Sequence, residues 1–234
     1  MALLSFISDE KLEEFVREVI DKVQAKADKA EVSLYKNVVD PFSSAFDASR
    51  QGITVDDWVE QEKARQAQKT LQNALGKFHQ KVIGEIPGWH DAGTNGSYDV
   101  GNEGQKIIAE IKNKHNTMNS SSAPGVYQKL VGHLQYGYKG QGYTAYLITM
   151  VPKSKKRYDK PWSPQLTLHN LREDIRQIDG ASFYELATGS PTALRDLYYA
   201  LPIVFEKVLG SQAQAVGGTL LFAELFDRVY EISS

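Results

Sequence analysis

The stretch YDVGNEGQKIIAEIKNK, residues 98–114, decides the fold that this sequence predicts. Within it, residues 106–111 bring apolar side chains close together, as a buried strand does. Successive side chains on a strand point to opposite faces, so Glu110 and Lys112 share one face. The sequence therefore predicts a carboxylate and an ammonium side by side on an otherwise apolar strand.

A second carboxylate, Asp99, is separated from Glu110 by ten residues, and residues 101–104 among them have the composition of a tight turn. Such a turn folds the Asp99 segment back antiparallel, beside Glu110. Two carboxylates and a lysine at a strand end suit Mg²⁺, which prefers carboxylate oxygens and leaves positions for water and phosphate. Lys112 would then position or activate a water aimed at phosphorus. The competing interpretation is a hairpin whose exposed ends carry an ordinary ion pair.

This arrangement resembles the PD-(D/E)xK nuclease superfamily, with Tyr98-Asp99 in place of Pro-Asp and Glu110-Ile111-Lys112 as the ExK element. The surrounding sequence is similar to a group of type II restriction endonucleases that cut short GGNCC-type sites. The matching pieces are EIKNKHN at 110–116 with TMNS at 117–120, QNALG at 72–76 with HQ at 79–80, GW at 88–89, DG at 179–180, FYE at 183–185 and TG at 188–189.

The resemblance implies an α/β fold with a restriction-endonuclease-like core, in which helices flank a mixed sheet of about five strands. It implies a Mg²⁺-dependent endonuclease whose catalytic residues are Asp99, Glu110 and Lys112. The metal would be held by Asp99, Glu110 and the backbone carbonyl of Ile111. A homodimer acting on double-stranded DNA at a short palindrome, and leaving 5′-phosphate ends, is also implied.

The helix expected before the sheet departs from the superfamily pattern, in which it sometimes adds an acid to the metal site. No Asp or Glu lies between Arg65 and Gly84, which leaves Gln80 and Asn73 as the polar candidates for that position in the metal site. His79 on the same helix is expected to pack or to face solvent, because a single helical histidine without a paired ligand is weak support for a metal site.

Basic and polar residues beyond the ExK element are the candidates for DNA contact. Residues 153–160 hold five basic residues and one acid directly after a strong strand, which favours a DNA-backbone arm over a solvated loop. His115 has two interpretations of equal weight, a contact with phosphate or the attacking water, and an ordinary loop position. The expected DNA-binding residues are Lys114, His115, Asn116, Gln128, Lys129, Lys153, Lys155, Lys156 and Arg157.

The composition is that of an ordinary globular protein, with 234 residues, 27 basic and 29 acidic side chains and no cysteine. Disulfide scaffolds and zinc–thiolate sites are excluded. We expect a single nuclease domain over 1–234, in which 1–50 form a helical extension packed on the core. Because no apolar run reaches membrane-span length and no signal peptide is recognisable, we expect a cytoplasmic, prokaryotic protein without membrane contact.

Periodicity and capping signals predict the remaining elements. The expected helices are 9–30, a short turn at 42–46 ended by Gly52, a long helix from Thr54 to Ile86 with Leu71 on its buried stripe, 125–136, 171–178, and one that begins at Ser190-Pro191 and contains Pro202. The expected strands are 143–151, 181–186 and a first strand or loop at 89–93. The tail from 220 to 232 fits either a strand or a helix.

Two alternative functions accompany this interpretation. One is a repair or recombination nuclease with the same core that reads DNA structure instead of sequence. The other is a DNA-binding protein that keeps the fold without activity, against which the complete set of Asp99, Glu110 and Lys112 argues.

Overall fold

A computed structural model describes residues 2–28, 39–93, 98–138, 141–164, 171–210 and 220–230. The chain divides into two compact units. Residues 17–77 form the first, which we call the helical unit, and residues 1–16 with 78–234 form the second, the sheet unit. Two long helices, α1 (Asp9–Asp28) and α4 (Val55–Glu85), each contribute to both units. The expected single domain with a packed N-terminal extension stays a prediction.

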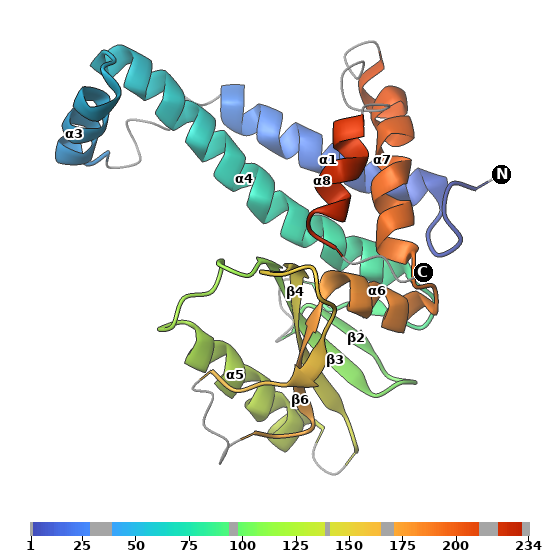
Figure 1. Cartoon of the computed structure of the whole chain (residues 1–234). Coiled ribbons are helices and arrows are strands. Elements are labelled where there is room, and N and C mark those ends of the chain that lie inside the picture. The colour runs from blue at the N-terminus through green and yellow to red at the C-terminus, as the bar shows by residue number, and fades with distance from the viewer. Residues whose placement is uncertain are drawn as a thin grey trace. The chain divides into compact units, whose positions relative to one another are not determined.

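The sheet unit contains a six-stranded mixed sheet in the order β1-β2-β3-β4-β6-β5 (Figure 1). The central strands β3, β4 and β6 are parallel, whereas β1, β2 and β5 pair antiparallel. This confirms the expected mixed sheet flanked by helices, with six strands in the described part of the chain. The strands are β1 (His90–Asp91), β2 (Val100–Asn102), β3 (Ile107–Lys114), β4 (Thr144–Val151), β5 (Asp159–Pro161) and β6 (Ile175–Asp179).

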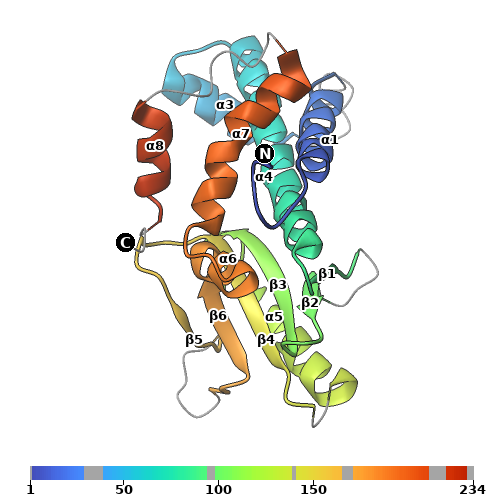
Figure 2. The same ribbon diagram turned by 90° about the vertical axis from the view of Figure 1, so that its right-hand side faces the viewer.

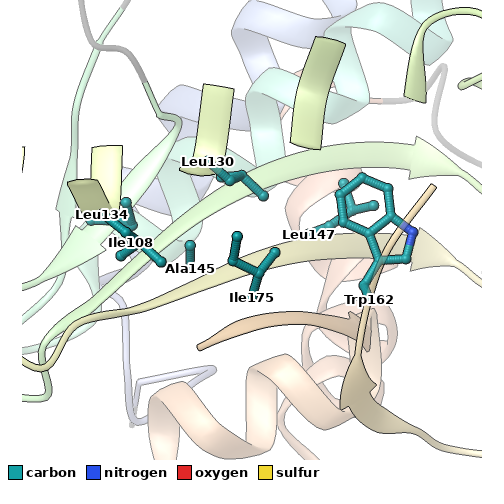
Figure 3. Packing of buried hydrophobic residues seen from close by; sticks show 7 residues of the cluster. All are labelled: Ile108, Leu130, Leu134, Ala145, Leu147, Trp162 and Ile175. Atoms are coloured by element: carbon teal, nitrogen blue, oxygen red, sulfur yellow. The ribbon is translucent and has the colours of Figure 1, made fainter. Parts of the chain in front are cut away.

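Helices cover both faces of this sheet. On one face, α5 (Ala123–Gly132) packs Leu130 into an apolar cluster with β3, β4 and β6 (Figure 3). On the other face lies α6 (Gly180–Thr188), where the ring of Phe183 is 6.2 Å from that of Tyr146 (Figure 2). The cluster on the α5 face consists of Ile108, Leu130, Leu134, Ala145, Leu147, Trp162 and Ile175. Because strand side chains alternate, Glu110 and Lys112 share the α5 face with Ile108.

The sequence prediction interchanged two elements after residue 170. The segment predicted as a helix at 171–178 ends in the strand β6, and the predicted strand at 181–186 is the helix α6. Ile175 and Ile178 have helical spacing, but helices cover both faces of the sheet, so isoleucines on both faces of β6 are buried. In α6 both aromatic residues are buried, a pattern that a buried strand shares.

Capping and close packing explain why α6 begins where it does. Asp179 Oδ1 accepts the Ser182 backbone N–H at 3.0 Å, which is an N-cap contact. A Cβ on Gly180 would lie 2.6 Å from the Met150 carbonyl oxygen, so only glycine lets the helix start this close to β4.

The helices of residues 39–85 follow their capping signals. Asp40 caps α3 (Pro41–Gln51), and Pro41 occupies its first turn, so this proline starts a helix of eleven residues where the sequence suggested a short turn. Gly52 ends α3 with a φ of 67°, as expected. Thr54 and Asp57 form the reciprocal cap of α4. Leu71 is exposed, so its assignment to the buried stripe was wrong.

The other helices differ in detail from the predicted ranges. α5 starts two residues before the predicted helix and continues as a π-helical turn, η1 (His133–Gly137). α7 (Ala193–Leu209) begins after Thr192, two residues later than the predicted cap; Thr192 makes no side-chain capping hydrogen bond, and the helix contains Pro202. The undecided tail forms a helix, α8 (Leu220–Asp227). Across the described ranges, no helix combines the length and apolarity that crossing a membrane requires.

Candidate active site

The β2–β3 hairpin brings Asp99 beside Glu110, as the sequence predicts. Val100 pairs with Ala109, and the Asp99 backbone N–H donates to the Ala109 carbonyl at 2.9 Å. The turn lies later than predicted, because residues 101 and 102 still belong to β2. The chain reverses at residues 103–106 instead, where Lys106 has a φ of 57°.

Glu110 is the most constrained acid of the site. Its side chain is 9% exposed, and each carboxylate oxygen accepts a hydrogen bond from one lysine. Lys112 Nζ lies 2.7 Å from Oε1, and Lys129 Nζ, which comes from α5, lies 2.7 Å from Oε2. Burial favours the neutral acid, but the hydrogen bonds from Lys112 and Lys129 outweigh burial and lower the pKa of Glu110. Glu110 is therefore a carboxylate anion flanked by two cations.

Asp99 differs from Glu110 in its surroundings. Its Oδ2 accepts the Ile111 backbone N–H at 2.7 Å, which fixes the carboxyl group beside β3. Burial and the nearby charge of Glu110 raise the pKa of Asp99, against the opposing hydrogen bond from Ile111. Two carboxylates thus crowd one half-buried place, an arrangement that a divalent cation relieves.

The oxygen atoms that these residues offer suit a hard divalent cation. The N–H and C=O of a strand residue point to the same edge, so the Ile111 carbonyl points to the β2 edge, where its N–H meets Asp99. Two carboxylates and one carbonyl are oxygen donors of the type that Mg²⁺ takes. Within the described ranges, no group of three or more His, Cys, Asp or Glu side chains is placed to share a metal.

The side chain of Gln80 contacts Asp91 and the backbone of Asp99, which differs from the position expected of a third metal ligand. Its amide Nε2 donates to Asp91 Oδ1 at 2.6 Å and to the Asp99 carbonyl at 3.1 Å. This buried side chain joins the end of α4 to β1 and to the residue before β2. The sequence pointed to Gln80 as a polar candidate, and the structure gives it contacts that hold Asp99 in place.

The loop after β3 presents its polar residues to solvent. Thr117 Oγ1 accepts the Lys114 N–H at 2.9 Å and donates to the Lys114 carbonyl at 2.7 Å, which closes a tight turn. His115 and Asn116 are exposed within that turn. Gln128 is exposed on α5. Lys129 was expected to contact DNA phosphates. In the structure its ammonium contacts Glu110, a contact that no sequence signal indicated.

The basic segment after β4 starts at the same edge of the sheet. Lys114 pairs with Val151, so the chain leaves β4 beside the loop that follows β3. The lysines of this segment, Lys153, Lys155 and Lys156, are exposed. Arg157 instead lies against α6, with its guanidinium 2.7 Å from Glu185 Oε2. The predicted DNA arm therefore has a solvent-facing part and an anchored end.

Comparison with known proteins agrees with this geometry. Residues 4–210 match the model of the Eco47II restriction endonuclease family. The chain belongs to this family. It is 38% identical to the type II restriction enzyme Eco47II of Escherichia coli, over 100% of this chain and 99% of that protein. It is 30% identical to the type II restriction enzyme Sau96I of Staphylococcus aureus, over 96% of this chain and 88% of that protein.

Family membership decides between the functions that the sequence left open. The chain is a type II restriction endonuclease, a site-specific enzyme that acts on double-stranded DNA. It is not assigned to the repair nucleases or to the inactive DNA-binding proteins. Type II restriction enzymes generally need a divalent metal ion, which the oxygen donors of Asp99 and Glu110 suit.

Proposed function

We propose that this enzyme is a Mg²⁺-dependent endonuclease of the PD-(D/E)xK type that cuts a short GGNCC-like palindrome and leaves 5′-phosphate ends. The observation that supports the proposal most is the contact of Lys112 with Glu110 at 2.7 Å, beside Asp99. These three side chains meet beside the middle of the central strand β3.

Each residue has a definable task in this proposal. Asp99, Glu110 and the Ile111 carbonyl would hold Mg²⁺, which supplies charge stabilisation at the reacting phosphate. Lys112 Nζ positions or activates the water that attacks phosphorus, and Glu110 keeps this ammonium in place. Gln80 fixes the backbone of Asp99, so that its carboxyl group stays close to β3.

The polar rim of the site would hold the DNA backbone. Lys114, His115 and Asn116 lie at the carboxyl end of β3, the exposed lysines of the basic segment follow β4, and Arg157 anchors that segment. Gln128 lies on the exposed face of α5. Contacts of this kind set affinity and orientation, whereas sequence reading requires groups that reach base edges.

A homodimer acting on a palindrome, in the bacterial cytoplasm where the DNA is, completes the proposal. Two-fold symmetry of the site would match the two-fold symmetry of a protein dimer. The relatives in Escherichia coli and Staphylococcus aureus are bacterial enzymes.

Cleavage of a plasmid of known sequence tests the metal site. Asp99→Ala and Glu110→Ala should each lower the single-turnover rate in Mg²⁺ by roughly a thousandfold or more, because each removes a ligand oxygen. Binding to the same DNA in Ca²⁺ should weaken far less. Glu103→Ala is the matched control, since Glu103 is an exposed acid in the turn of the same hairpin, at the opposite end of β3 from the loop that follows it.

Retained cleavage in either variant, within about tenfold of the parent, would remove that residue from the ligand set. Sequencing the cut ends of the parent reaction tests the rest of the proposal. Fragments that end within GGNCC-like sites and carry 5′-phosphates are expected, and cuts at unrelated sites would refute the proposed specificity.

A further inference from the structure

Glu110 has both of its carboxylate oxygens engaged by lysines. Lys112 takes Oε1 and Lys129 takes Oε2, each at 2.7 Å. A divalent cation that approaches Glu110 is repelled by both ammonium groups and competes with them for the carboxylate oxygens. The two lysines differ in how easily they leave, which makes the exchange specific.

Lys129 is the more solvent-exposed of the two lysines. Its side chain is 40% exposed, whereas that of Lys112 is 24% exposed. Lys129 belongs to α5, so moving its side chain leaves the β2–β3 hairpin unchanged, while Lys112 is two residues from Glu110 on the same strand. An ion pair with an exposed partner has a lower cost of separation, because water replaces the lost contact.

We infer that Lys129 is a second active-site lysine, which holds Glu110 in the metal-free enzyme and is exchanged for the divalent cation. Lys129 thereby sets the affinity of the site for metal. The released ammonium stays at the site, where it can meet the phosphate that arrives with the DNA. This inference rests on the proposed role of Glu110 as a metal ligand.

Mn²⁺ binding to the DNA-free enzyme tests the exchange, measured by electron paramagnetic resonance of free Mn²⁺. Lys129→Met should bind Mn²⁺ about tenfold more tightly than the parent, because the competing charge is gone. Lys129→Arg should keep the affinity of the parent, since it restores a cation at the same place. Lys106→Met is the matched control, because it removes one charge about 13 Å away along the strand, beyond the screening length.

Three outcomes separate the inference from the proposed function. An affinity of Lys129→Met within about threefold of the parent would overturn the inference, as would an equal gain in Lys106→Met. If the parent binds no Mn²⁺, or if Asp99→Asn binds it as well as the parent does, the proposed metal site fails instead. A gain confined to Lys129→Met, with unchanged circular dichroism, supports the exchange.

Discussion

Lys112 and Lys114 lie on the same face of β3 but differ in their distance from the acids. Lys112 reaches Glu110 directly, at 2.7 Å. Lys114 lies one pleat repeat further along the strand, about 7 Å at ~3.3 Å per residue. Side chains of the same chemistry on the same face thus have different expected roles, chemistry for Lys112 and phosphate contact for Lys114.

Single-turnover cleavage at saturating enzyme separates these two roles. Lys112→Ala should lose about a hundredfold or more in rate and still bind DNA, because it removes a group that acts in the transition state. Lys114→Ala should lose mainly affinity. If Lys114→Ala is the inactive variant and Lys112→Ala cleaves normally, the assignment of the ExK element to residues 110–112 is wrong.

At the scale of elements, a buried polar contact between two side chains joins α4 to α6. His79 Nδ1 lies 3.0 Å from the Tyr184 hydroxyl. Burial lowers the pKa of His79 from 6.5 to about 4, so the imidazole is neutral in the folded enzyme near neutral pH. Of the two positions expected for His79, packed or facing solvent, the structure shows the packed one.

The low pKa of His79 predicts how stability depends on pH. The unfolded chain takes up the proton near pH 6.5 and the folded chain near pH 4, so stability is complete above pH 6.5 and falls as pH decreases toward about 4. The loss approaches about 3 kcal/mol by the linkage relation. His79→Gln should reduce the difference between urea unfolding free energies at pH 7 and pH 4.5, and an unchanged difference would contradict this origin of the pH dependence.

The segment after β4 combines solvent-exposed lysines with an anchored end. The Tyr158 backbone N–H donates to Asp179 Oδ2 at 2.7 Å, and Arg157 Nε donates to Ser182 Oγ at 3.1 Å. Both contacts attach the segment to the start of α6. The exposed lysines before Arg157 therefore project from a defined place at the carboxyl edge of the sheet.

Neutralising the three exposed lysines tests their role in DNA binding. The triple variant Lys153→Ala, Lys155→Ala, Lys156→Ala should weaken binding to all sequences alike and reduce the salt slope by up to about 3, one contact each at ~0.9. Lys160→Ala serves as the control, because its ammonium lies over the Tyr158 ring at 5.4 Å. An unchanged slope in the triple variant would identify an ordinary solvated loop.

At the scale of the whole molecule, the proposed homodimer carries one cleavage site per subunit. A palindrome places equivalent phosphates on the two strands, and a two-fold dimer presents equivalent groups to both. Each subunit should then cut one strand, so that a dimer with one inactive subunit makes a nick.

Co-expression of the parent with tagged Glu110→Ala allows the mixed dimer to be purified. This species should convert supercoiled plasmid to the nicked form and accumulate it, while the Glu110→Ala homodimer should do neither. Failure to recover any untagged chain with the tagged one would refute the dimer. Linear product formed without a nicked stage would refute the division of work between subunits.

The sequence by itself determined the elements whose signals are local. The β2–β3 hairpin, the α4 cap at Thr54 and the strand at 144–151 follow from alternation, capping and β-propensity. The grouping of Asp99, Glu110 and Lys112 was also predictable, because it lies within one hairpin and alternation fixes which side chains share a face.

Only the tertiary structure decided the features that depend on distant partners. The assignment of β6 and α6 required knowledge that β6 is central, because a strand covered on both faces loses the alternation that identifies it. Lys129 reaches Glu110 from 19 residues away, and Gln80 reaches the Asp99 carbonyl from the end of a helix. Sequence spacing does not encode such contacts, since they arise from the packing of α5 and α4 against the sheet unit's hairpin.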